Sequence, residues 1–307
     1  MARLVSEAQA NFEFFSPVKY SEPNILVRQG LMIEIFAVSL SKEIIKKVQY
    51  QESNTIYDYL WAGSSEFYLS LIKDHPISLR KTSTTKLIQK YPIYNHLCEI
   101  KSPYTACAYD NSKFLTTLGN TVYEYDIETA NSSKKVISQD ILRQRSVINA
   151  ICCNKNLVFL GSFNRLVYII DRRSGKMLSA LEGQEGGVIQ CIIEGNYLYV
   201  GGRKDSQILL WDLRNPSLPV NLFSFPRTHN TFQKILFDVN TNLDLLIGNN
   251  DGTIVKYNSS GEVLKNFYGH FDAVNSVQFF QAGIISSSGQ RHYERVSLPS
   301  LIRIFDE

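Results

Sequence analysis

Three residues near the C-terminus, His270, Asp272 and Ser286, have the side-chain types of a hydrolase triad. In such a triad the histidine takes the proton of the serine hydroxyl, and the carboxylate orients the histidine. The same three types also form structural hydrogen bonds in β-sheet repeats, because buried polar groups must be paired. We interpret them in this structural way, and we expect no catalytic residues in the chain.

The spacing of the other reactive residues indicates no metal, redox or nucleotide chemistry. The remaining histidines, His75, His96, His229 and His292, stand far apart without ligand spacing. The 5 cysteines form no C-x-x-C pair, and their odd number favours a reducing compartment over a disulfide framework. No glycine-rich phosphate loop is present. We therefore predict no metal, no cofactor, no small-molecule substrate and no enzymatic activity.

Cationic and aromatic side chains gather in three regions. The whole chain carries 32 basic and 29 acidic residues, so bulk charge does not indicate a nucleic-acid-binding protein. Such clusters are usually solvated faces, but cations interleaved with aromatics are also what phosphate contact and base stacking require. The cations are Arg80, Lys81, Lys86 and Lys90, then Arg203, Lys204, Arg214, Arg227 and Lys234, and finally Arg291 and Arg295; the aromatics are Tyr91, Tyr94, His229, Phe232, His292 and Tyr293.

A repeat along the chain must position these residues. Seven short segments rich in β-branched and aromatic residues end near positions 37, 81, 126, 171, 212, 258 and 306, which are 41 to 48 residues apart. A period in the low forties with four short strands per unit is typical of a WD-type β-propeller. The sequence therefore predicts an all-β, seven-bladed WD40-type propeller, although only Trp211-Asp212 spells the WD dipeptide and only Gly269-His270 the Gly-His that opens a blade.

The repeat also assigns local structure. We expect one domain over residues 1–307, with blades at about 11–40, 55–83, 93–130, 145–180, 186–223, 231–266 and 269–306. Residues 250–252, Asn-Asp-Gly, are a tight-turn sequence, and residues 42–47 are the best candidate for a short helix or a loop. Cys107, Cys152 and Cys191 are expected to be buried at matching positions of inner strands. The last blade closes through residues 1–10 or through packing alone.

Several motifs are more specific than the repeat: TIYDYLW at 55–61, YNHL at 94–97, GGRKD at 201–205 with LLWDLR at 209–214, and SGQR at 288–291. In this order they closely resemble the telomerase Cajal body protein family of WD-repeat proteins, over all seven blades. The resemblance implies a long Pro-rich and acidic N-terminal extension in the animal members, and we expect this chain to differ from them in that respect. It is most similar to a compact, fungal, splicing-associated member.

The resemblance implies a non-enzymatic propeller of the nucleus, with the cytoplasm also open, that engages small nuclear RNA or snRNP proteins and other splicing proteins. Two alternatives stay open: a protein-only scaffold or adaptor, for example in a ubiquitin ligase, and a trafficking factor for small Cajal-body or telomerase RNA. The candidate RNA- or partner-binding residues are Arg203, Lys204, Asp205, Arg214, Arg291 and His292. Asp205 is expected to orient Arg203 and leave Lys204 to meet phosphate. A purely structural Arg203–Asp205 pair is equally open.

The N-terminal residues lack the apolar segment of a signal peptide, and the apolar runs have the length of strands. We therefore expect an intracellular protein without a membrane partner.

Overall fold

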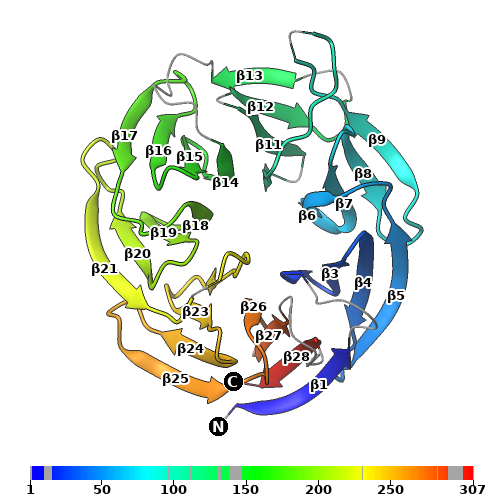
Figure 1. Ribbon diagram of the computed structural model, residues 1–307, viewed down its shortest axis with the longest axis vertical. Coiled ribbons are helices and arrows are strands. Elements are labelled where there is room, and N and C mark those ends of the chain that lie inside the picture. The colour runs from blue at the N-terminus through cyan, green and yellow to red at the C-terminus, as the bar shows by residue number, and fades with distance from the viewer. Residues whose placement is uncertain are drawn as a thin grey trace. The chain divides into compact units, whose positions relative to one another are not determined.

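The computed structural model describes residues 2–9, 16–95, 97–110, 112–119, 121–129, 133–137, 147–229, 231–281, 283–289 and 300–306. Its regular elements in these ranges are all β-strands, arranged as seven four-stranded antiparallel sheets (Figure 1). Within the same ranges, no helix is long and apolar enough to cross a membrane. The fold is that of a seven-bladed WD40-type β-propeller, which confirms the predicted fold class.

Each sheet is one blade, and its strands are hydrogen-bonded in chain order except in the last sheet. The first three sheets contain β2 (Lys19–Ser21), β3 (Asn24–Gln29), β4 (Met32–Val38) and β5 (Ile44–Gln51); β6 (Ile56–Ala62), β7 (Ser64–Ile72), β8 (Ile77–Lys81) and β9 (Leu87–Tyr91); and β10 (Ala106–Asp110), β11 (Lys113–Leu118), β12 (Thr121–Asp126) and β13 (Ser133–Ile137).

The next three sheets contain β14 (Ile148–Cys153), β15 (Leu157–Ser162), β16 (Val167–Asp171) and β17 (Met177–Leu181); β18 (Val188–Glu194), β19 (Tyr197–Gly202), β20 (Gln207–Asp212) and β21 (Val220–Pro226); and β22 (Asp238–Val239), β23 (Leu245–Gly248), β24 (Thr253–Tyr257) and β25 (Val263–Tyr268). The last sheet has the order β1 (Arg3–Gln9), β28 (Leu301–Asp306), β27 (Gly283–Ser288) and β26 (Val274–Phe280).

The N-terminal strand closes the last blade. β1 pairs antiparallel with β28, from Arg3 opposite Asp306 to Gln9 opposite Leu301. Arg303 on β28 also binds the Glu7 carboxylate at 3.0 Å. Of the two modes of closure that the sequence left open, the added strand is therefore the one observed.

The seven repeated segments predicted from the sequence form the third strand of each sheet, from β4 to β28. These strands are mostly buried, because they pack on both sides, whereas the fourth strands alternate between exposed and half-buried residues. A run of consecutive apolar residues therefore marks the interior of a blade, which explains why the repeat was visible without a complete WD signature.

The suggested short helix at residues 42–47 is wrong. Most of this segment belongs to β5, which pairs antiparallel with β4, and Val48 lies opposite Ile35. Ile44 and Val48 are half-buried, while Lys46 and Lys47 between them are exposed. Pairing with a buried strand thus overrides a weak local preference for helix.

The tight turn predicted at residues 250–252 joins β23 to β24. Gly252 has φ +84°, a conformation that side chains with a Cβ rarely adopt. A Cβ at this position would also lie 2.0 Å from the carbonyl oxygen of His270. The Gly252 carbonyl instead accepts hydrogen bonds from the backbone nitrogens of Gly269 at 3.0 Å and His270 at 3.1 Å.

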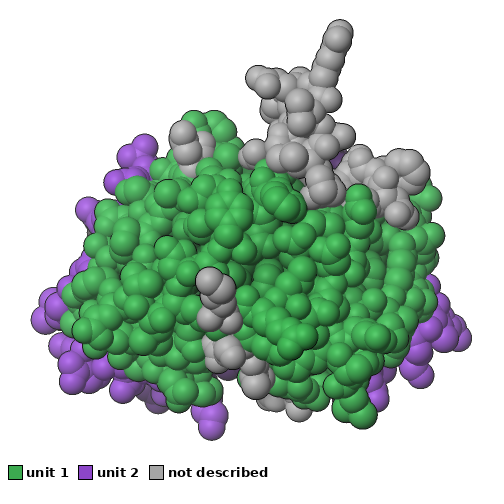
Figure 2. Space-filling view, turned by 90° about the horizontal axis from the view of Figure 1, so that it is seen from below, with its two compact units in different colours: residues 1–51, 203–210, 222–307 green, residues 52–202, 211–221 purple. Residues whose placement is uncertain are grey.

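The chain divides into two compact units, residues 1–51, 203–210 and 222–307, and residues 52–202 and 211–221 (Figure 2). Within each unit, consecutive sheets share hydrophobic clusters. In the first unit, Leu246 and Ile254 pack with Val277 and Phe305 of the last sheet. In the second unit, one cluster joins β10–β13 to β14–β17, and another joins β14–β17 to β18 and β19. Whether the whole chain is one domain stays a prediction.

The predicted burial of the three matched cysteines needs one correction. Cys152 and Cys191 are buried and pack in one cluster from adjacent sheets, but Cys107 is only half-buried, beside Cys153 in another cluster. All three cysteines lie on the first strands of their sheets, as expected. Trp211 packs against the cluster of Cys152 and Cys191 but is itself only partly buried, so it is not a full core residue.

Candidate nucleic-acid interface

The turn between β19 and β20 carries three of the six candidate residues. It presents Lys204 to solvent, keeps Arg203 half-buried and buries Asp205 completely. Lys204 has φ 44°, in the left-handed region that few residues other than glycine occupy. Such an uncommon conformation persists where its surroundings hold it, and the contacts of Asp205 supply that restraint.

Asp205 links the turn to Arg227, at the end of β21. The Arg227 Nε donates to the Asp205 carbonyl oxygen at 3.0 Å, and the Arg227 backbone nitrogen donates to the Ser206 carbonyl at 2.9 Å. Burial lowers the pKa of Arg227 to about 10, and the negative charge of Asp205 opposes that shift. Arg227 is 6% exposed, so it supports the turn from inside and offers no contact surface.

Lys204 meets an exposed aromatic ring. Its Nζ lies 4.1 Å from the centroid of the Phe232 ring, within the range of a cation–π interaction. Phe232 is 67% exposed, whereas His229 is buried, with its Nε2 3.1 Å from the Gln233 carbonyl oxygen. A cation and an exposed ring held together can contact a phosphate and stack on a base. Among the aromatics of this segment, Phe232 is therefore the surface residue and His229 is structural.

The segment that carries Phe232 is fixed to the last blade. The Gln233 side-chain amide donates to the Gly289 carbonyl at 2.6 Å and also binds Asn275. Arg291 and His292, the two candidates that follow Gly289, lie outside the described residues. Their place at this surface stays a prediction.

Arg214 follows the other end of β20 and has its own partner. Its Nε donates to Oδ2 of Asp212 at 2.8 Å, and its backbone nitrogen donates to Oδ1 at 2.9 Å. These bonds lower the pKa of the Asp212 carboxyl. The Arg214 side chain is nevertheless 71% exposed, so it offers a paired cation to solvent.

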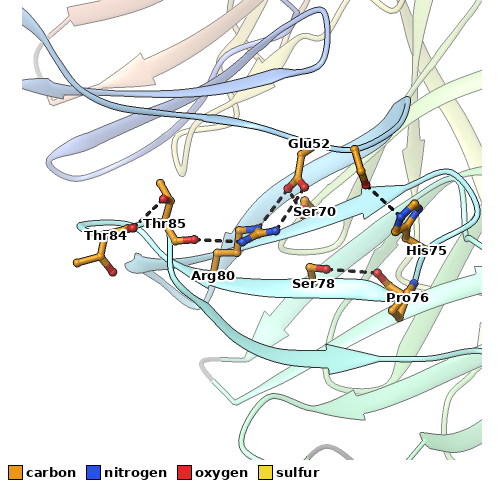
Figure 3. A network of polar contacts seen from close by, with 9 residues as sticks. Glu52, Ser70, His75, Pro76, Ser78, Arg80, Thr84 and Thr85 are labelled. Carbon is orange, nitrogen blue, oxygen red and sulfur yellow. Dashed lines mark hydrogen bonds and ion pairs between the residues drawn. The ribbon is translucent and has the colours of Figure 1, made fainter.

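One cation of the basic segment at residues 80–90, Arg80, is buried and not part of the surface. Arg80 is 8% exposed, and its Nε and Nη2 lie 3.3 and 3.4 Å from the carboxylate oxygens of buried Glu52 (Figure 3). Ser70 donates to the same carboxylate at 2.9 Å. Arg80 is therefore structural, while Lys81, Lys86 and Lys90 are exposed.

The three residues of the suspected triad are all buried in the first unit. His270 Nε2 lies 2.7 Å from the Ser286 Oγ, but its Nδ1 has no hydrogen-bond partner among the described residues. Burial, with a contribution from Arg303, lowers the pKa of His270 to about 3. A triad requires a carboxylate on that second nitrogen and access for a substrate. The geometry supports the structural interpretation. In the described part of the chain, no three metal-binding side chains cluster.

Sequence reasoning missed an exposed apolar loop between β9 and β10. Four of its side chains are between 36% and 65% exposed: Tyr94, Leu97, Ile100 and Tyr104. The Tyr104 ring lies 4.7 Å from that of Tyr57 on β6, and a bridge joins Tyr94 to Ile100. Part of this loop is the YNHL motif, in which the sequence singled out Tyr94 as a ring near cations but did not indicate the exposed apolar side chains around it.

Several curated proteins with similar sequences are named telomerase Cajal body protein 1, the family that the motifs resemble. The chain is 26% identical over 301 residues to telomerase Cajal body protein 1 of Rattus norvegicus, covering 89% of this chain and 56% of the relative. The Homo sapiens protein is 26% identical over 296 residues, covering 89% of this chain and 53% of the relative. Protein SWT21 of Candida glabrata is 32% identical over 199 residues, covering 57% of this chain and 47% of the relative. The predicted resemblance is thereby confirmed, and the chain spans about half the length of the curated relatives it matches.

Two further comparisons concern the fold. A computationally designed protein, Ika8, superimposes with a TM-score of 0.71 at 13% identity, and the match covers 99% of both chains. At this identity the likeness supports the fold alone. No protein-family model matches the chain.

Proposed function

We propose that this chain is a non-enzymatic WD-repeat protein of the nucleus that binds small nuclear RNA or snRNP components and supports pre-mRNA splicing. Similarity to telomerase Cajal body protein 1 and to protein SWT21 favours a nuclear, RNA-associated role. The single observation that carries an RNA contact in this chain is the Lys204 ammonium, 4.1 Å from the exposed ring of Phe232.

The chemistry of this pair suits a single-stranded RNA segment. An ammonium group has three hydrogen-bond donors, so Lys204 can bind a phosphate while it lies over the ring. An exposed aromatic face stacks on any base, and stacking contributes about 1–3 kcal/mol per base. Unpaired loops are the usual targets of RNA recognition, because their bases can be splayed onto such a ring.

Three residues that support the pair keep it in place. Asp205 and Arg227 fix the turn below Lys204, and Gln233 fixes the segment that carries Phe232. Because the surface pair is held by buried Asp205 and Arg227 and by half-buried Gln233, it needs little ordering when RNA binds, and preorganisation of this kind raises affinity. Arg203, half-buried in the same turn, supplies a second cation.

The experiment measures RNA affinity against salt. A fluorescent pool of random single-stranded RNA, about ten nucleotides long, is titrated with the wild type, with Arg203→Ala/Lys204→Ala and with Phe232→Ala. Each phosphate contact adds about 0.7 to the slope of log affinity against log salt. The double variant is expected to bind more weakly with a slope shallower by about 0.7–1.4. Phe232→Ala is expected to lose affinity and keep its slope.

A matched control is available in the same unit. The Lys265 Nζ lies 5.9 Å from the Phe267 ring on β25, so Lys265→Ala removes another cation beside a ring. This variant is expected to bind like the wild type. Unchanged affinity and slope in a well-folded Arg203→Ala/Lys204→Ala protein would contradict the proposed RNA surface.

The second candidate function is a protein-only scaffold, and the exposed apolar loop between β9 and β10 favours it. Exposed aromatic and aliphatic side chains gathered on one loop are typical of a protein contact. Tyr94→Ser/Leu97→Ser would be compared with the wild type by affinity purification and quantitative mass spectrometry. If this role is the main one, the variant loses specific protein partners while its RNA affinity does not change. An unchanged set of partners would remove the support for a scaffold at this loop.

A further inference from the structure

A polar cavity of about 610 Å³ lies in the second unit, where the sheets β10–β13 and β14–β17 adjoin. It is lined by the turns that follow β14 and β16 and by residues of β11 and β12. Unlike most ligand pockets, which are largely apolar, this cavity is lined by polar side chains. Its charged residues are Lys113, Lys155, Arg172, Arg173, Glu124 and Asp171.

The charges of this cavity do not balance, since four cations face two carboxylates. Glu124 is occupied by Arg172, at 2.7 Å, and by Lys113, at 3.8 Å. Lys155 and Arg173 are exposed and form no ion pair with any described residue. The charge of Arg173 contributes to lowering the pKa of the Asp171 carboxyl, but four cations against two carboxylates leave the cavity with a net charge of two positive units for a ligand.

The Arg172 side chain and the turn that carries Arg172 and Arg173 are held before any ligand arrives. The Arg172 guanidinium lies over the Tyr109 ring, 4.1 Å from its centroid, and its backbone nitrogen donates to the Asn156 carbonyl at 2.8 Å. The Asp171 Oδ1 accepts hydrogen bonds from the backbone nitrogens of Arg173 and Ser174, both at 2.8 Å. These bonds lower the pKa of the Asp171 carboxyl and fix the turn that carries both arginines.

We propose that this cavity binds a phosphorylated side chain, phosphoserine or phosphothreonine, of a protein partner. A phosphate monoester carries a charge of about −1.5 to −2 and three acceptor oxygens, which match the net positive charge of the cavity and its two exposed cations, Lys155 and Arg173. A phosphodiester of a nucleic-acid backbone carries one charge and would bring further anions toward Glu124 and Asp171. Peptide N–H groups, in contrast, can donate to those carboxylates.

The shape of the site favours the same ligand. The volume exceeds that of one phosphate group and leaves room for the residues that flank it. None of the described lining residues is aromatic, and the Tyr109 ring is half-buried against Arg172, so the described lining offers no exposed ring to stack on a base. Arginine and lysine clusters without stacking rings are typical of phosphopeptide recognition. This inference does not depend on the proposed RNA surface.

The test uses the full chain and two immobilised peptide pools with degenerate flanks, one with a central phosphoserine and one with serine. We expect binding to the phosphorylated pool only. Lys155→Gln/Arg173→Gln should weaken that binding at least about tenfold, because it removes two charge-assisted contacts. The matched control, Lys81→Gln/Lys86→Gln, removes two exposed cations of the same unit outside the cavity and should bind like the wild type.

Two further arms separate the sources of phosphate. Binding should weaken as pH falls below about 6, because the monoester dianion is then protonated, and no histidine is among the described lining residues. Inorganic phosphate should compete with the phosphoserine peptides for the cavity, whereas a uridine oligonucleotide should not. Equal binding of the two pools, or loss of oligonucleotide binding in Lys155→Gln/Arg173→Gln, would overturn the proposal. Neither result depends on Lys204 and Phe232, so its failure is distinguishable from that of the RNA surface.

Discussion

The buried ion pair between Glu52 and Arg80 should stabilise the second unit only while both partners are present. Glu52 is 3% and Arg80 8% exposed, and Ser70, completely buried, donates to the same carboxylate (Figure 3). Arg80 also donates through Nη1 to the Thr85 carbonyl at 3.1 Å. Each charge is thus removed from water and compensated mainly by the other, so a single substitution leaves an unpaired charge in a poorly solvated site.

The perturbation is a double-mutant cycle of Glu52→Gln and Arg80→Met. Breaking a buried pair from one side costs about 3–5 kcal/mol, whereas replacing both partners is often close to neutral. We expect each single variant to lose about 3–5 kcal/mol of unfolding free energy. The double variant should lose no more than either single variant, and therefore at least about 3 kcal/mol less than the sum, because it leaves no unpaired buried charge. Urea titration supplies the free energies, provided that the m-value is unchanged.

An exposed ion pair of the same unit is the control. The Lys101 Nζ lies 3.2 Å from the Glu99 carboxylate, and the two side chains are 46% and 55% exposed. Glu99→Gln should cost less than about 1 kcal/mol. If Glu52→Gln costs as little, or if the effects at Glu52 and Arg80 are additive, burial does not govern this pair and the reasoning is wrong.

Three further predictions concern the folded core. Burial lowers the pKa of His270 to about 3, so below about pH 6.5 only the unfolded chain takes up a proton at this residue. The unfolding free energy of the wild type should therefore fall on acidification by about 1.4 kcal/mol per pH unit more than that of His270→Gln. Equal slopes of unfolding free energy against pH for the two proteins between pH 6.5 and 5, measured by urea titration, would contradict this. Iodoacetamide should modify exposed Cys98 first and Cys152 only on unfolding, because Cys152 is buried and burial raises the pKa of its thiol. Early adducts on Cys152, detected by mass spectrometry, would refute this prediction. Trp211→Ala should cost about 2–3 kcal/mol, less than a full core residue, because Trp211 is only partly buried; a loss above about 5 kcal/mol in urea would show that it is part of the core.

The fold was predictable because its signal repeats. Each blade needs a buried third strand, and such strands are visible as apolar runs at a nearly constant period. The edges of blades were harder to predict. β5 has exposed Lys46 and Lys47 and depends on pairing with β4, so its strand conformation is set by a neighbour and not by its own residues. Closure by β1 depends on a partner at the far end of the chain.

The candidate interface was predictable only as a region. The motif at residues 201–205 marked the turn, and its exposed member, Lys204, is where the sequence suggested a phosphate contact. Neither the burial of Arg227 nor the pairing of Arg80 with Glu52 has a local sequence signal. The backbone carbonyl of Asp205, which accepts from Arg227, and the carboxylate of Glu52, which accepts from Arg80, lie 22 and 28 positions away. Basic residues look alike in a sequence, and only packing separates a buried support from a surface cation.

The most direct test of the RNA surface is ultraviolet crosslinking in cells, followed by sequencing of the RNA attached to the wild type and to Lys204→Ala/Phe232→Ala. We expect the wild type to recover small nuclear RNAs and the double variant, equally abundant and folded, to recover several-fold less. Recovery of small Cajal-body or telomerase RNA instead would support RNA binding at this surface but contradict small nuclear RNA as the ligand. No RNA above background with the wild type, or equal recovery with the variant, would contradict the claim that Lys204 and Phe232 bind RNA.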